Sequence, residues 1–151
     1  MYKTINRHIL YALIPMLFYC NISILNAQEV NRKEIIVEGD IQSAFEKTVD
    51  FLVKQEFFIE ELNKNSGFIK AKRYIKNKKV ISKKYGEILS VSLLLRSLES
   101  GKTKIRLQMY VKEQYRSDDF GANYKDLGLS EDIERYTAFL KKLSEFMERG
   151  E

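Results

Sequence analysis

The chain has 151 residues and a net charge of +5, and its one cysteine and one histidine, Cys20 and His8, both lie within the first 27 residues. The remaining 124 residues therefore exclude a disulfide, the usual zinc sites and a nucleophile activated by histidine. The modest positive charge does not by itself indicate a nucleic-acid partner.

Residues 1–27 have the three parts of a secretory signal peptide. Lys3, Arg7 and His8 form a basic head, Ile9–Leu25 is an apolar run, and Ala27 is a small residue at a plausible cleavage point. Cleavage there leaves residues 28–151, the length of one domain, with 24 basic and 21 acidic residues and a net charge of +3. We therefore expect a signal peptide at 1–27, a single domain at 28–151, and export to the periplasm or the extracellular space.

Two other roles for this N-terminal segment stay open. An uncut apolar run would act as an N-terminal membrane anchor, although a membrane-spanning helix usually needs about 20 apolar residues. The run Leu17-Phe18-Tyr19-Cys20 also has the outline of a lipoprotein signal, in which Cys20 would carry the lipid. Tyr19 is bulky at a position where such signals carry a small residue.

The first elements of the predicted domain are a strand and an amphipathic helix. The strand is predicted at Lys33–Glu38, which contains three β-branched residues in a row. Asp40 is a suitable N-cap for a helix over Ile41–Glu56. Helical spacing predicts that the inward face of this helix consists of Ile41, Ala44, Phe45, Thr48, Val49, Leu52 and Val53.

Two strands are predicted next, at Phe57–Leu62 and Phe68–Tyr74. The polar turn between them ends in Gly67, a residue suited to a positive φ. We expect a polar linker at Ile75–Gly86 before the following strand.

Two antiparallel strands with one solvent-exposed face are predicted next, from the longest apolar stretch, Glu87–Leu98, and from the alternating segment Lys104–Lys112. We expect Tyr115–Gly128 to be a polar loop and Ser130 to cap a final helix. The apolar stripe of that helix is Ile133, Tyr136, Leu140, Leu143 and Met147. The order β-α-β-β-β-β-α predicts a single α+β domain, with an antiparallel sheet and two helices packed on one face.

Two short sequence patterns accompany this order. After the predicted first helix come Glu56-Phe57-Phe58-Ile59-Glu60, a polar turn and Phe68-Ile69-Lys70-Ala71, and in the last helix Tyr136 precedes Phe139 and Leu140. The chain thus resembles helix-grip domains of TATA-binding-protein-like architecture, and is similar to small exported bacterial domains. These include the helix-grip domains of the lipoprotein subunit of the outer-membrane β-barrel assembly machine. The resemblance implies a non-catalytic envelope protein and identifies no functional residues.

Positive charge is concentrated in one segment, which we call the basic segment. Its 15 positions contain no acid and eight basic residues: Lys70, Lys72, Arg73, Lys76, Lys78, Lys79, Lys83 and Lys84. It could meet an anionic lipid surface, a polyanionic cell-wall polymer or an acidic protein surface. The alternative is a solvated hairpin whose lysines protect the sheet edge. Export argues against a nucleic-acid partner.

For catalysis the chain offers carboxylate pairs, Asp118-Asp119 and Glu131-Asp132, but a polar loop and a helix start explain these pairs better than catalysis does. We therefore expect a non-enzymatic envelope domain without a metal or cofactor, acting as a protein-interaction or structural module. The alternative is a binder or carrier of a lipid or anionic envelope molecule. That ligand would use the basic segment or the groove between the last helix and the sheet, whose apolar residues also suit a closed core. The oligomeric state stays open.

Overall fold

Antiparallel strands form one six-stranded sheet in the order β1-β5-β4-β3-β2, and β6 pairs with the second half of β5. The computed structural model describes residues 33–79, 82–99, 101–116 and 121–149. The predicted signal peptide, its cleavage point and Cys20 lie outside these residues. The strands are β1 (Glu34–Glu38), β2 (Phe58–Asn63), β3 (Phe68–Lys76), β4 (Lys84–Leu98), β5 (Lys102–Arg116) and β6 (Ala122–Leu129), and the helices are α2 (Ile41–Lys54) and α3 (Ile133–Glu148).

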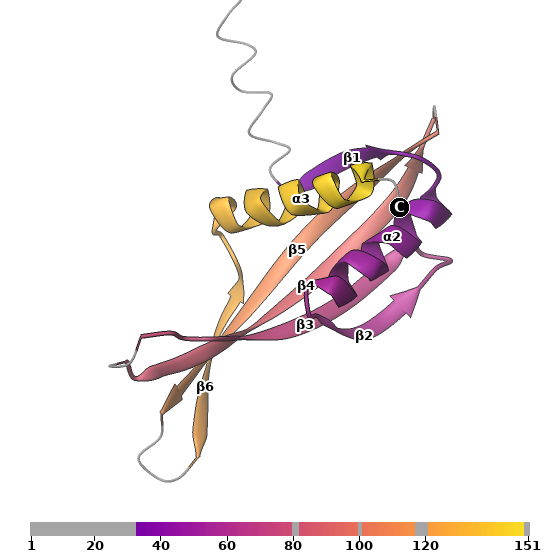
Figure 1. Ribbon diagram of the computed structural model, residues 1–151. Coiled ribbons are helices and arrows are strands. Elements are labelled where there is room, and N and C mark those ends of the chain that lie inside the picture. The colour runs from indigo at the N-terminus through magenta and orange to yellow at the C-terminus, as the bar shows by residue number, and fades with distance from the viewer. Residues whose placement is uncertain (1–32, 80–81, 100, 117–120, 150–151) are drawn as a thin grey trace, which may run out of the picture. The chain divides into compact units, whose positions relative to one another are not determined.

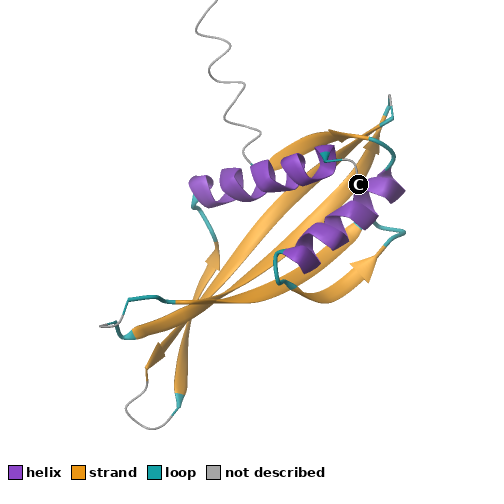
Figure 2. Ribbon diagram, viewed as in Figure 1, coloured by secondary structure: helices purple, strands orange, loops and turns teal. Residues whose placement is uncertain are grey.

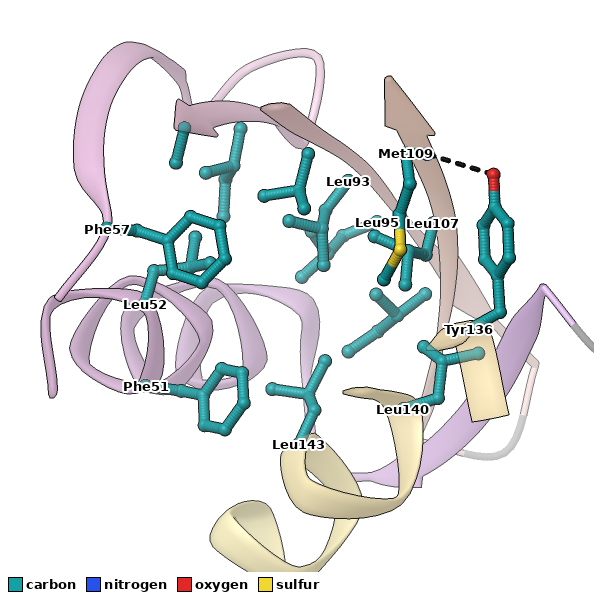
Figure 3. Close-up of a cluster of buried hydrophobic side chains, with 14 of the residues drawn as sticks. Phe51, Leu52, Phe57, Leu93, Leu95, Leu107, Met109, Tyr136, Leu140 and Leu143 are labelled. Carbon is teal, nitrogen blue, oxygen red and sulfur yellow. Dashed lines mark hydrogen bonds between the residues drawn. The ribbon is translucent and has the colours of Figure 1, made fainter. Parts of the chain in front are cut away.

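Both helices pack on the same face of this sheet, as Figures 1 and 2 show. The predicted fold class, a single α+β domain with an antiparallel sheet and two helices, is thereby confirmed. The core lies between the helices and the long central strands β4 and β5 (Figure 3). On β4 and β5 the buried residues alternate along each strand, as predicted for strands with one solvent-exposed face: Leu89, Val91, Leu93, Leu95, Ile105, Leu107, Met109 and Val111.

Helix α2 begins and ends for local reasons. The carboxylate of Asp40 accepts hydrogen bonds from the backbone N–H groups of Gln42 and Ser43, at 2.9 and 3.0 Å. At the other end, Glu56 takes a positive φ of 62°, so the helix stops at Lys54, two residues before its predicted end. One inward residue was predicted wrongly, because the side chain of Val53 is 59% exposed.

The turn between β2 and β3 depends on Gly67. This residue has a φ of +61°, as predicted, and its carbonyl accepts a hydrogen bond from the N–H of Leu95 at 2.8 Å. A Cβ at this position would lie 2.4 Å from the carbonyl oxygen of Leu95. Both the backbone angle and the close approach therefore require glycine.

The strands extend further than predicted beyond the helices. Strand β3 continues to Lys76 and β4 begins at Lys84, so the predicted linker Ile75–Gly86 is strand at both of its ends. The predicted polar loop Tyr115–Gly128 is also wrong, because β5 continues to Arg116 and β6 begins at Ala122. Figure 1 shows these strand ends projecting past the two helices. The described side chains of β6 from Asn123 to Leu127 are all exposed, so this strand lacks the one-sided alternation on which the prediction depended.

Helix α3 begins at Ile133, and its N-cap is Asp132 and not the predicted Ser130. The carboxylate of Asp132 accepts a hydrogen bond from the N–H of Arg135 at 3.0 Å. The backbone N–H of Ser130 instead donates to the carbonyl of Met109 at 2.8 Å, which extends the pairing of β6 with β5. The predicted apolar stripe is confirmed at Tyr136, Leu140, Leu143 and Met147, which are buried.

Candidate functional site

The alternation of side chains along strands divides the basic segment, so its eight residues do not form one surface. Lys70 and Lys72 of β3 lie on the face opposite the helices, which we call the helix-free face. Arg73 lies on the helix side, next to α2 and α3. Lys84 is paired with two carboxylates. The remaining four residues are exposed around the end of the β3–β4 hairpin: Lys76, Lys78, Lys79 and Lys83.

Lys84 belongs to a network that fastens α3 to the sheet. Its ammonium lies 2.6 Å from Glu113 and 3.0 Å from Glu87, and Glu87 also pairs with Arg135 of α3 at 2.9 Å. Burial by itself would lower the pKa of Lys84, but the hydrogen bonds to Glu113 and Glu87 outweigh burial and raise it. Hydrogen bonds from Lys84 and then from the Tyr115 hydroxyl lower the pKa of Glu113. The ammonium group of Lys84 is thus already paired with carboxylates of the same fold.

The helix-free face carries a hollow of about 480 Å³, which crosses strands β2 to β6. We call it the outer hollow. Its apolar lining includes Ile88 and Leu129. Its polar lining combines three ammonium groups, one carboxylate, three hydroxyls and an amide, which belong to Lys70, Lys72, Lys112, Glu60, Ser90, Ser92, Tyr110 and Gln108.

Strand register places these polar side chains in two neighbouring rows. One row runs Lys72, Ser90 and Tyr110 across β3, β4 and β5, and the next runs Lys70, Ser92 and Gln108. A serine occupies the middle of each row, between two longer side chains. The surface is recessed at these two serines because serine is the smallest of the side chains that meet in the outer hollow.

A β-bulge supplies the carboxylate of the outer hollow. Between Ile59 and Glu61 the register of β2 against β3 shifts, so Glu60 is an extra residue in β2. Its carboxylate lies 2.6 Å from the ammonium of Lys72 and 3.7 Å from that of Lys70. The hydrogen bond from Lys72 lowers the pKa of Glu60. The two lysine side chains remain 45% and 46% exposed, and therefore accessible to a partner from solvent.

The opposite side of the outer hollow is organised by Asp126 of β6. The hydroxyl of Tyr110 donates to this carboxylate, and the ammonium of Lys112 lies 4.0 Å from it. The hydrogen bond from Tyr110 and then that from the N–H of Gly128 lower the pKa of Asp126, and the same Tyr110 contact raises the pKa of the phenol. Strand β6 thus orients Tyr110 and Lys112 at the border of the hollow.

The lining of the outer hollow can hold an anion. Three ammonium groups face one carboxylate there, so the positive charge is in excess. The serine hydroxyls and the Gln108 amide can donate and accept hydrogen bonds, which suits a ligand carrying hydroxyl groups as well as negative charge. A volume of about 480 Å³ is within the range of small-ligand sites.

The interior between helices and sheet, the other predicted ligand site, is filled by side chains along its centre. Leu93, Leu95, Leu107 and Leu143 are fully buried there (Figure 3). A pocket of about 130 Å³ remains at the end of this interior where Arg73 lies. Among the described residues, the space for a ligand within this interior is therefore confined to that end.

Sequence reasoning placed Lys70 and Lys72 of the outer hollow in the basic segment but missed Lys112, Glu60, the hydroxyls and the amide. The available signal was the pair Ser90 and Ser92, small polar residues at alternate positions of the most apolar predicted strand. Of the carboxylate pairs considered for catalysis, Asp118-Asp119 lies outside the described residues, and Asp132 caps α3.

No model of a known protein family matches the chain, and comparison with curated proteins finds no similar sequence. The described part of the chain contains no cluster of three or more histidine, cysteine, aspartate or glutamate side chains suited to a metal ion. No helix in the described ranges is long and apolar enough to cross a membrane.

Proposed function

We propose that the chain is an exported, non-enzymatic binding module that holds an anionic molecule of the cell envelope in the outer hollow. The observation that carries this proposal is the excess of ammonium groups around a polar floor, on the face that both helices leave uncovered. The predicted signal peptide and the resemblance to exported helix-grip domains support the assignment to the envelope.

The arrangement of charge favours an anionic partner over a neutral one. Lys70 and Lys72 share the single carboxylate of Glu60, and Lys112 approaches Asp126 no closer than 4.0 Å. A phosphate or carboxylate group between β3 and β5 would meet ammonium groups from both sides. Each hydrogen bond to a charged group typically contributes about 1.5–3 kcal/mol, which gives a measurable dependence on individual side chains.

Apolar side chains border the polar floor of the hollow. Phe58 lies opposite Lys72 across β2 and β3 and is 67% exposed, and Leu129 lies opposite Tyr110 and is 59% exposed. A ligand that carries rings or chains beside its negative groups would cover these side chains. Anionic glycans and anionic lipid headgroups both have this character, and the proposal requires only the anionic group that they share.

Recovery of partners from solubilised envelope tests the proposal. The immobilised protein should retain an anionic lipid or glycan at low salt and release it at high salt. Ser92→Glu places a carboxylate on the floor of the hollow and should reduce recovery by about tenfold or more, a loss of about 1.4 kcal/mol. Ser97→Glu, the same change at an exposed position of the same strand, is the control. Equal recovery by both variants, or recovery of proteins alone, would contradict the proposal.

A further inference from the structure

A second pocket lies on the helix side of the sheet, at the end of the interior where α2 and β3 meet α3. It has a volume of about 130 Å³, and we call it the Arg73 pocket. Its walls come from the last turn of α2, from the residue before β2, from β3 and from the middle of α3, and include Phe51, Gln55, Phe57, Arg73, Ala138 and Phe139.

The walls of the Arg73 pocket are largely aromatic. Phe139 contacts Phe51 and Phe57 edge to face, with ring centroids 5.4 and 6.0 Å apart. An apolar cavity of about 150 Å³ in a protein holds a benzene molecule. The Arg73 pocket, at about 130 Å³, is slightly smaller than that cavity, and its size is on the scale of a single ring or a short aliphatic chain.

The charges at this pocket are all positive. Arg73, Arg135 and Lys142 contribute to the lining, and none of its described lining residues is acidic. The charge of Arg135 is already balanced by Glu87 at 2.9 Å and by Asp132 at 3.6 Å. Arg73 and the exposed Lys142 are therefore the cations that an incoming anion would meet.

Arg73 has donors that the fold does not use. Its guanidinium stacks over the ring of Phe57 at 4.8 Å, and its Nη1 donates to the carbonyl of Gln55 at 3.2 Å. Its Nε–H is buried without a hydrogen-bond partner among the described residues. A guanidinium has five donors in a geometry that matches a carboxylate, and an unsatisfied buried donor is costly. The Arg73 guanidinium is thus held against an aromatic wall and still has a hydrogen-bond donor without a partner among the described residues.

We propose that the Arg73 pocket binds a small organic carboxylate whose body is an aromatic ring or a short aliphatic chain. The body lies against Phe51, Phe57 and Phe139, and the carboxylate faces the Arg73 guanidinium. This site is on the opposite side of the sheet from the outer hollow, so the inference does not rest on the function proposed above.

Titration of the purified protein with phenylacetate, followed by backbone amide NMR, tests this inference. We expect saturable shifts at Gln55, Ala138 and Phe139. Phenethyl alcohol, which keeps the ring and lacks the charge, should bind about tenfold more weakly or worse, and acetate, which keeps the charge and lacks the ring, should produce no saturable shift. Absence of saturable shifts, equal affinity for acid and alcohol, or shifts centred on Ser90 and Tyr110 would overturn the inference.

Two variants separate the charge from the shape of the site. Arg73→Met should weaken phenylacetate binding about tenfold or more, whereas Lys141→Met, at an exposed position of α3 beside the pocket, should leave it unchanged. Ala138→Leu fills the pocket from an exposed helix position without changing charge, and should abolish binding. If Arg73→Met does not fold, Ala138→Leu decides the matter, and unchanged affinity of that variant overturns the inference.

Discussion

The hydroxyl of Tyr136 completes the hydrogen bonding of β5 at a point between its two edge partners. Strand β1 pairs with β5 up to Arg106, and β6 pairs with it from Tyr110 onward. In the gap between them, the N–H of Met109 donates to the Tyr136 hydroxyl at 3.0 Å (Figure 3). Because buried backbone donors need a partner, this side chain takes the place of a strand.

Substitution Tyr136→Phe tests this role. The change keeps the buried ring and removes the acceptor, so the N–H of Met109 is left buried and unpaired. We expect the free energy of unfolding to fall by about 1–3 kcal/mol, measured by urea denaturation. Tyr74→Phe, which removes a hydroxyl from an exposed side chain, is the control and should be close to neutral. Equal stabilities of Tyr136→Phe and the unchanged protein would show that the hydrogen bond contributes nothing.

The inward face of α2 shows what residue spacing can and cannot predict. Ala44, Phe45, Thr48 and Leu52 were expected to be buried, and they are. Phe51 was missed, because it is buried by Phe139 and Phe146 of α3, whose ring centroids lie 5.4 and 5.6 Å away. The spacing in one helix defines a stripe toward the sheet but contains no information about the side on which a second helix packs.

At the scale of secondary-structure elements, the predictions fail where the strands extend beyond the two helices that pack on the sheet. Lys104–Lys112 alternates cleanly because one face meets the core, and its assignment as a strand is confirmed. The described side chains of β6 from Asn123 to Leu127 are all exposed, so the polar sequence there resembles a loop. Backbone pairing with β5, which composition does not reveal, makes this segment a strand.

The Lys84 network joins β4, β5 and α3 near the edge of the sheet area that the helices cover. Its ion pairs predict that the stability of the fold depends on pH. The pKa of Glu113 is lowered below 4.5 in the fold, so its contribution is complete above pH 4.5 and is lost as the pH falls through the folded-state pKa. The pKa of Lys84 is raised above 10.5, so its contribution is lost only above that pH. Both contributions are therefore complete at neutral pH.

Glu113→Gln should accordingly be less stable than the unchanged protein at pH 7, by about 1–2 kcal/mol. The difference in the free energy of unfolding should shrink as the pH is lowered through the folded-state pKa of Glu113, because the native carboxylate then also loses its charge. Chemical denaturation at pH 7 and at a series of lower pH values measures this. Glu131→Gln, at an exposed position before α3, is the control. A difference for Glu113→Gln that stays constant with pH would contradict the assigned ion pair.

At the scale of the whole molecule, the fold class follows from the sequence, but the candidate site follows only in part. Alternation in β4 and β5 together with two amphipathic helices requires one covered and one open sheet face, and this is confirmed. The basic segment was treated as one surface because its residues are adjacent in sequence. Strand alternation separates Lys72 from Arg73, and the register of β3, β4 and β5 brings Lys72 beside Ser90 and Tyr110.

The two faces of the sheet thus present different chemistry to a partner. The helix-free face offers a broad polar hollow with excess ammonium groups, whereas the helix side carries the small aromatic Arg73 pocket. We propose that the position of positive charge on the helix-free face, and not the net charge of the chain, determines binding to the envelope.

Two pairs of charge reversals test this claim most directly. Lys70→Glu with Lys112→Glu alters the outer hollow, and Lys78→Glu with Lys79→Glu makes the same change in net charge at the end of the β3–β4 hairpin. Salt-sensitive binding to solubilised envelope should fall by about tenfold or more for the first pair and stay close to that of the unchanged protein for the second. Equal losses for the two pairs, or no loss for the first, would contradict the account.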